Sequence, residues 1–590
     1  MKIKIMWLVL SCLMAMALVL ASCGPATVEE EEEEVVPEEE EVIVPEEEEE
    51  EVLPEVEKGP QYGGQLTLAL QAGVSVWGMA QQGAPQEALS PVYERLGGAD
   101  WSRGPAGTNE YSYLYRYTPG EYRIGLLAES WEQPEPYTFV FHLREGIHWQ
   151  NKPPVNGREL TADDVVFTMQ KWLEFNRSET KVYRDDVTSV EALDKYTVQF
   201  KVREGSYANF GSFGWAWIYI APVETPQVYE LDFNDWRSIC GTGPFVIKDF
   251  VLDSSLLYER NPGYWGYDEV NPENRLPYVD RIKAIVIPDR TTILSALRTG
   301  KIDKMSNVFP EEAHSLMKTN PELKYVSCID AQAYPGVSWR MKEGPFADIR
   351  VRKAMSMAID RKAIIRDYLA GEGAEVSWPQ CAGWGESVAT PVEKMPPEIR
   401  EIYEYNPEKA RQLLAEAGYA DGFQTHLISF DALMERLQIL QAYWKDIGVD
   451  VELRPMESGA LWGTLFSRRH QAMFAAGWGQ GDPVGVLAYF TTGHYYNLSD
   501  TSDAYYDESF YTIMETADDA ERDRLCKELD LYYKSQVFAV AFPSQVDYTF
   551  WQPWLKSYHG EQSLGTYYGQ GQVWARIWID QDLKMEMIGE

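Results

Sequence analysis

The sequence predicts an α/β protein built from two or three lobes. A chain of 590 residues with 45% hydrophobic content and 20 Trp is larger than one ordinary core, so several lobes are expected. Strand and helix patterns also follow each other along the chain, first in residues 126–172. These observations favour α/β architecture and exclude a small single-core domain.

Residues 126–172 contain a strand, a turn and a helix. From Tyr137 to Leu143, alternate side chains form an apolar face, which is the period of a strand. Gly146 and the Pro153-Pro154 pair end the extended run. Thr161 and Asp164 then have the spacing of a helix N-terminal cap before an apolar helix face.

Further elements are expected along the rest of the chain. Strand patterns occupy 63–70, 196–202, 281–288 and 451–453. One helix face, 293–297, is stopped by Gly300, and another helix starts at Asn406 with Pro407 in its first position and ends at Gly418. A helix containing Trp444 leads into the last of these strands.

The charge balance argues against a nucleic-acid partner. The formal net charge is −39 and the pI is near 4.6, so no basic patch is available to neutralise phosphates. Eighteen Glu lie between Glu29 and Glu57. The rest of the chain is therefore only moderately acidic.

The amino terminus has the composition of an export signal. Lys2 and Lys4 precede an apolar run from Ile5 to Leu20. Residues 20–24, LASCG, resemble the bacterial lipobox, which implies cleavage before Cys23 and lipidation of its thiol. Residues 29–60 are mostly Glu, Val and Pro, and we expect a disordered tether there.

Several motifs together resemble the family 5 extracellular solute-binding proteins of ABC importers, the dipeptide, oligopeptide and nickel-binding lipoproteins. The motifs are GGQL at 63–66, LAESW at 127–131, FHLREGIHW at 141–149, TADDV at 161–165, LRTGKID at 297–303, PFADIRVRKA at 345–354, AIDR at 358–361 and NPEKARQLLAEAG at 406–418. They occur in the family's order. The resemblance implies a bilobal, type II periplasmic-binding-protein-like fold with two large lobes, a hinge and an extra small domain.

The resemblance also implies a division of the chain and a set of partners. The expected parts are a signal peptide at 1–22, the lipidated Cys23 and tether at 23–60, lobe I at 61–85, 213–304 and 541–590, the small domain at 86–212, and lobe II at 305–540. The expected partners are a peptide or other small-molecule ligand, the permease and ATPase subunits of an importer, and a membrane reached through the lipid. We expect an exported, membrane-anchored monomer.

No motif for catalysis, a cofactor or a metal is present. The chain lacks GxSxG, HExxH, a Walker loop and a complete GxGxxG, and its seven His are scattered. We therefore expect no catalytic residues, no cofactor and no metal site. Cys240, Cys328, Cys381 and Cys526 could form up to two disulfides or remain buried thiols.

The candidate ligand loop is residues 475–483, AAGWGQGDP. Trp478 resembles the family's pocket Trp, and the resemblance implies an Asp three residues later that pairs with a ligand amino group. Gly481 stands there instead. Asp482 either takes over that role or is a structural turn residue before Pro483.

Other candidates are an arginine and several tryptophans. Arg340 stands where the family has Asn, and it either binds a ligand carboxylate or is a solvated charge. Trp77, Trp215, Trp339 and Trp478 offer flat faces for an oligosaccharide, which is the alternative ligand class. A hydrolase or a sensor on the same scaffold is the alternative of another functional class.

Overall fold

The computed structural model describes residues 59–79, 84–115, 117–174, 186–206, 218–230, 232–329, 336–376, 378–380, 382–476, 482–565 and 569–589. Its first sheet has the order β1 (Gln65–Leu70), β10 (Arg281–Val286), β9 (Ser255–Arg260) and β8 (Phe245–Val251). β1 pairs with β10 in parallel, with Leu66 opposite Ile282. The predicted strands at 63–70 and 281–288 are thus confirmed, and the structure shows that they are neighbours although they are far apart in sequence.

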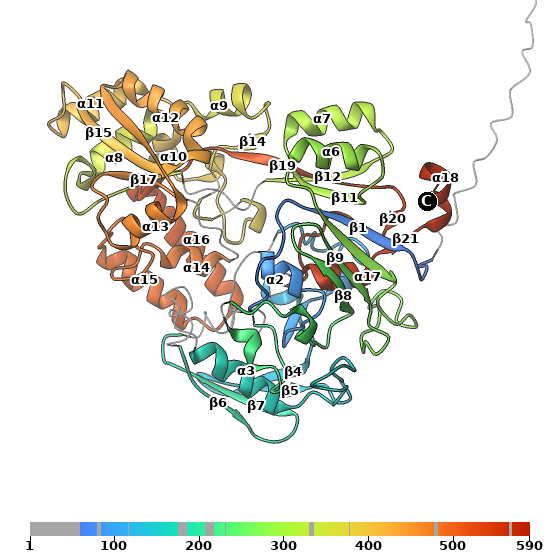
Figure 1. Ribbon diagram of the computed structural model, residues 1–590. Helices are drawn as coiled ribbons and strands as arrows, with labels where there is room; N and C mark the ends of the chain where they lie inside the picture. Colours follow the sequence, from blue (N-terminus) through green and yellow to red (C-terminus); the bar gives the residue numbers. More distant parts are fainter. Residues whose placement is uncertain are drawn as a thin grey trace, which may run out of the picture. The chain divides into compact units, whose positions relative to one another are not determined.

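The end of the chain packs against this first sheet. α17 (Gln570–Arg576), β20 (Leu555–Lys556) and β21 (Trp578–Ile579) contribute Trp554, Trp574 and Trp578 to the core that contains Leu66 and Ile282. α18 (Gln581–Ile588) follows. In Figure 1 the red C-terminal elements accordingly lie beside the blue β1.

A second sheet is formed by β11 (Lys304–Val308), β19 (Ser544–Trp551) and β12 (Lys324–Ile329), all antiparallel. The first residues of β19 also pair with β14 (Gly373–Ala374). α6 (Arg290–Arg298) and α7 (Pro310–Thr319) pack beside this sheet. The helix predicted before Gly300 is confirmed, and this glycine has a left-handed φ of 70°.

The third sheet is antiparallel and has the order β4 (Ala128–Glu135), β5 (Thr138–Leu143), β7 (Thr197–Val202) and β6 (Val187–Ala192). α3 (Ala162–Glu174) packs against it (Figure 1). The strands predicted at 137–143 and 196–202 are confirmed. The predicted helix start is also confirmed, since the backbone N–H of Thr161 donates to Asp164 Oδ2 at 3.1 Å. Nearby, α2 (Ala84–Leu89) precedes a short pair formed by β2 (Gly97–Ala99) and β3 (Arg123–Gly125).

The largest sheet has the order β16 (Val449–Met456), β15 (Phe423–Phe430), β17 (Met473–Ala475), β13 (Val337–Trp339) and β18 (Ala539–Val540). The helices of this region are α8 (Ile349–Met357), α9 (Arg361–Tyr368), α10 (Pro397–Tyr403), α11 (Pro407–Glu416), α12 (Met434–Asp446), α13 (Ser458–Phe466), α14 (Pro483–Ala488), α15 (Ala504–Glu515) and α16 (Asp519–Gln536). The predicted start of α11 is confirmed, since Asn406 Oδ1 accepts a hydrogen bond from the backbone N–H of Lys409 at 3.0 Å.

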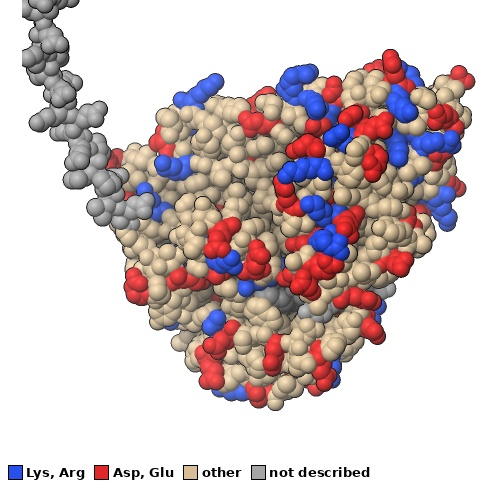
Figure 2. All heavy atoms as spheres, turned by 180° about the vertical axis from the view of Figure 1, so that it is seen from behind, with Lys and Arg blue, Asp and Glu red and all other residues tan. Residues whose placement is uncertain are grey.

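Contacts divide the chain into Met1–Lys58 and one compact unit, Gly59–Glu590. The finer division into lobes and a small domain stays a prediction. Cys240 and Cys526 are buried thiols outside any disulfide, and Cys381 lies outside the described residues. On the face shown in Figure 2, acidic and basic side chains are intermixed.

Candidate functional site

A pocket of about 520 Å³ opens where the first and second sheets meet. Residues from many segments line it, among them the end of β1, α2, β9, β10, the start of β11 and α17. This volume lies within the range of about 300–1,000 Å³ that is typical of small-molecule sites. The pocket is therefore the candidate ligand site.

The floor of the pocket is apolar and the polar groups lie around it. Leu68, Ala69 and Leu70 at the end of β1 line the pocket and are only partly buried. Leu256, Ile282 and Ala284 also border it but are almost fully buried in the core. Polar lining comes from separate parts of the chain, namely Glu87, Arg290, Lys304, Gln562 and Gln570. An apolar cavity with a few convergent polar groups suits an amphipathic organic solute.

Lys304 is the most unusual of these groups. It is half-buried, and its Nζ donates to the Tyr558 hydroxyl at 2.9 Å. The ammonium also lies 4.7 Å from the Trp574 ring centroid and 5.2 Å from that of Tyr558. Desolvation lowers the pKa of Lys304 to about 8, against the opposing fields of Glu561 and Glu87.

Arg290, the second cation in the lining, is held by protein groups. Its Nε and Nη2 donate to the carboxylate of Glu312, with the shortest distance at 2.6 Å. Nη2 also donates to the backbone carbonyl of Asn307 at 2.6 Å, and the guanidinium lies over Phe309. Arg290 therefore shapes the rim near β11.

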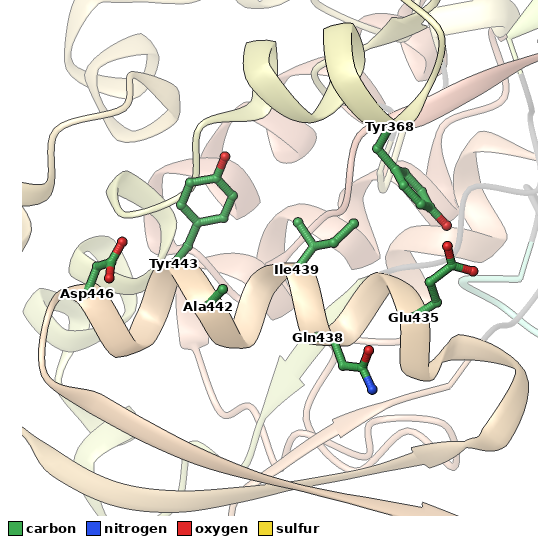
Figure 3. Close-up of a pocket in the computed structure, with 7 residues that line it drawn as sticks. All are labelled: Tyr368, Glu435, Gln438, Ile439, Ala442, Tyr443 and Asp446. Atoms are coloured by element: carbon green, nitrogen blue, oxygen red, sulfur yellow. The ribbon is translucent and has the colours of Figure 1, made fainter. Parts of the chain in front are cut away.

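A hollow of about 600 Å³ follows the surface of α12 (Figure 3). Six of its seven lining residues belong to that single helix, and Tyr368 of α9 completes it. Polar groups from several elements do not converge there as they do beside β1. This groove is therefore a weaker candidate for a ligand site.

Metal-binding clusters and membrane-spanning helices are both absent from the described ranges. They contain no group of three or more His, Cys, Asp or Glu side chains placed to hold a metal ion. Nor does any helix in the described ranges have the length and apolarity needed to cross a membrane.

Comparison with known families agrees with the geometry of the site. The family model described as "Bacterial extracellular solute-binding proteins, family 5 Middle" matches residues 124–497, which is more than half of the chain. The chain belongs to this family of solute-binding proteins. The resemblance drawn from the sequence motifs is thus confirmed.

Curated relatives of this solute-binding protein cover most of its length. Heme-binding protein A of Haemophilus influenzae is 27% identical over 486 residues, spanning 76% of this chain and 84% of that protein. Di/tripeptide-binding protein 1 of Pseudomonas aeruginosa is 28% identical over 472 residues, spanning 73% of this chain and 82% of that protein.

Solved structures share the fold. The periplasmic binding protein DppA from Helicobacter pylori, in complex with the peptide STSA, superposes with a TM-score of 0.67 at 22% identity. The match covers 88% of this chain and 99% of that one. AppA from Bacillus subtilis, in complex with a nonapeptide, gives 0.66 at 22% identity with the same coverage. These neighbours confirm the predicted bilobal α/β fold.

Among the residues predicted to bind ligand, Trp215, Trp478 and Gly481 lie outside the described residues. Trp77 and Trp339 are 1% and 0% exposed, so neither presents a ring face to a ligand in this structure. The Trp339 ring stacks on Phe346 and its Nε1 donates to the Val537 carbonyl at 2.8 Å. Both are core residues here.

Arg340 forms an internal ion pair. Its Nη2 lies 2.6 Å from Asp500 Oδ2 and its Nη1 donates to the carbonyl of Arg468 at 2.9 Å. The side chain is only 12% exposed. Arg340 is therefore a mostly buried, paired charge in this structure, and its contact with a ligand carboxylate stays a prediction.

Asp482 caps α14. Its Oδ1 accepts hydrogen bonds from the backbone N–H groups of Val484 at 2.9 Å and Gly485 at 3.0 Å. The other oxygen, Oδ2, is buried with no hydrogen-bond partner in the described part of the chain. Burial raises the pKa of Asp482 to about 7. This geometry supports the turn interpretation and leaves one oxygen unused.

Sequence reasoning missed Lys304, Trp574 and Gln570. A signal for Lys304 existed, because it directly follows the family motif at 297–303 and begins a strand. No local signal marks Trp574 or Gln570. They reach the pocket because the end of the chain returns to the first sheet.

Proposed function

We propose that this protein captures a peptide-like or other polar organic solute and delivers it to the permease of an ABC importer. The observation that carries the proposal is the pocket beside β1, in a chain of a solute-binding family. Relatives named for binding heme, dipeptides or tripeptides support an organic solute. The buried rings of Trp77 and Trp339 give less support to an oligosaccharide.

Capture proceeds by hinge closure without covalent chemistry. β19 supports this mechanism, because Ser544 and Gln545 pair with β14 while Tyr548 and Trp551 pair with β11 and β12. One strand therefore connects β11, which lines the pocket, to β14, which lies in the chain between β13 and β15 of the five-stranded sheet. A solute that contacts both sides of such a connection favours the closed form by its differential affinity.

The protein is held at the membrane by lipid on Cys23. The support is the lipobox-like segment and the acidic tether that follows it. We expect Cys23→Ser to move the protein from the membrane fraction to the soluble fraction. Recovery of this variant in the membrane fraction would contradict the anchor.

A thermal-shift screen tests solute capture. The purified protein is heated with oligopeptides, oligosaccharides, amines, organic acids and heme, and each compound is afterwards checked for chemical change. A ligand at about a hundred times its Kd stabilises the folded state by about 2.7 kcal/mol. We expect a peptide-like compound to raise the melting temperature and to return unchanged. A cleaved compound would instead support a hydrolase, and no shift with any compound would support a sensor.

A further inference from the structure

We propose that Lys304 binds a carboxylate group of the solute, so that the pocket selects carboxylate-bearing ligands. This inference rests on the proposed function and specifies the chemistry of its site. It assigns the anchoring charge to the start of β11, away from the loop before α14 that the sequence indicated.

The surroundings of Lys304 stabilise a cation without neutralising it. Its ammonium has one hydroxyl acceptor, Tyr558, and two aromatic faces. Within the described residues, no Asp or Glu oxygen lies within the 4.0 Å of an ion pair. A partly desolvated ammonium without a counter-ion is unfavourable, and a ligand carboxylate would supply the missing charge.

The two acidic residues whose fields reach Lys304 are Glu561 and Glu87. Glu561 turns toward its own loop, where Oε2 accepts from the backbone N–H of His559 at 2.7 Å and Oε1 lies 3.4 Å from His559 Nδ1. Glu87 is an exposed residue of α2 at the pocket wall. Neither forms an ion pair with the ammonium.

The other lining residues of the pocket fit a ligand that has one polar end and one apolar end. Gln570 Oε1 is buried without a hydrogen-bond partner among the described residues, so it is available to a ligand N–H. Arg290 is bound to Glu312 and does not compete for the carboxylate. Leu68, Ala69 and Leu70 of β1, which are only partly buried, offer the apolar surface.

Paired probes test this assignment by calorimetric titration. The probes are trialanine and its C-terminal amide, which represent a peptide carboxylate, and succinate and succinamide, which represent a free organic acid. Each is titrated into the wild type, Lys304→Met, Lys304→Gln and the control Lys301→Met, which removes an exposed cation three residues away. We expect at least one acid to bind the wild type and the control, and to bind both Lys304 variants at least about tenfold more weakly.

The amides show whether the Lys304 variants weaken binding by removing a charge contact or by altering the shape of the pocket. We expect them to bind weakly and without dependence on Lys304. Because the buried charge has no counter-ion, the ligand-free Lys304→Met variant should melt at the same temperature as the wild type or higher, whereas a purely structural lysine would lower it. If Lys304→Met fails to fold, Lys304→Gln, whose side chain remains polar, replaces it in the titrations.

The outcomes separate the two proposals. An acid that binds all variants equally, or an acid and amide that bind alike, overturns the carboxylate site and leaves solute capture intact. If only the neutral amides bind, and neither Lys304 variant changes their affinity, the carboxylate site is again overturned while solute capture stands. If none of these probes binds and the screen above also shows no ligand, both proposals fall.

Discussion

Two neighbouring charges at the start of β11 have opposite surroundings. Asp303 lies directly before the strand and is fully buried, whereas Lys304 is its first residue and lines the pocket. The buried Asp303 carboxylate accepts from the Thr67 backbone N–H at 2.6 Å and from Trp554 Nε1 at 2.8 Å, and it lies 3.5 Å from Lys584 Nζ. The Lys304 ammonium has a single hydroxyl acceptor.

This difference separates a structural charge from a functional one. Asp303 joins Thr67 of β1 to Trp554 and Lys584 near the end of the chain, so the protein itself supplies all of its partners. The Lys304 ammonium gains an ion-pair partner only when a ligand carboxylate binds. Asp482 is intermediate, because one of its oxygens caps α14 and the other has no partner in the described residues.

The largest effect on stability is expected from Asp303→Ala. The substitution leaves Lys584, Thr67 and Trp554 without their shared acceptor, and breaking a buried charge pair in this way costs about 3–5 kcal/mol. Urea unfolding measures the loss. Asp303→Asn keeps an acceptor and should lose less. A change within about 0.5 kcal/mol in the alanine variant would contradict the structural role.

A smaller effect is expected at the cap of α14. Asp482→Ala removes the acceptor for Val484 and Gly485 and should cost about 0.5–2 kcal/mol, while Asp482→Asn, also a good cap, should cost less. Both are measured by urea unfolding. If the free oxygen instead serves a ligand amine, Asp482→Asn will weaken an amine-bearing probe at least about tenfold while stability is retained.

The pH dependence of stability provides a finer test of Asp482. Its folded-state pKa of about 7 lies above the ordinary value of about 3.9, so between these pH values the folded state holds a proton that the unfolded state releases. The stability from this group is full below about pH 4 and is lost as the pH rises to 7. We expect the melting temperature of the wild type, relative to Asp482→Asn, to fall across this window. A constant difference would contradict burial of the carboxyl group.

The smallest effect is expected from Lys304 in the absence of ligand. Its pKa of about 8 lies below the ordinary value of about 10.4, so its unfavourable contribution is full below pH 8 and is relieved as the pH rises toward 10.4. Lost hydroxyl and ring contacts offset part of the relieved desolvation, so Lys304→Met should be as stable as the wild type or more stable at pH 7, and any gain should shrink above pH 8. A gain that is independent of pH would contradict a titrating ammonium.

Local sequence patterns were sufficient for most of the fold. The strand period at 137–143, the Asn406 cap and the Gly300 stop are properties of neighbouring residues, and the structure confirms them. Motif order additionally identified the family. These features depend on short-range chemistry that a sequence displays directly.

The candidate site depended on long-range packing and was harder to predict. Trp77 and Trp339 were candidates for ligand stacking, yet tertiary packing buries both. The charge of Arg340 is neutralised by Asp500, 160 residues later in the sequence. Lys304 gains its environment from Tyr558 and Trp574, more than 250 residues away, so its own segment does not reveal the pocket.

The most direct test of the central claim is an NMR titration of Lys304, assigned by comparison with the Lys304→Gln variant. The ¹³Cε resonance is followed against pH with and without succinate or trialanine, whichever binds more tightly. We predict a pKa near 8 in the free protein, because desolvation outweighs the fields of Glu561 and Glu87, and a clear rise when the carboxylate binds. An ordinary lysine pKa in the free protein that does not change on binding would contradict the account.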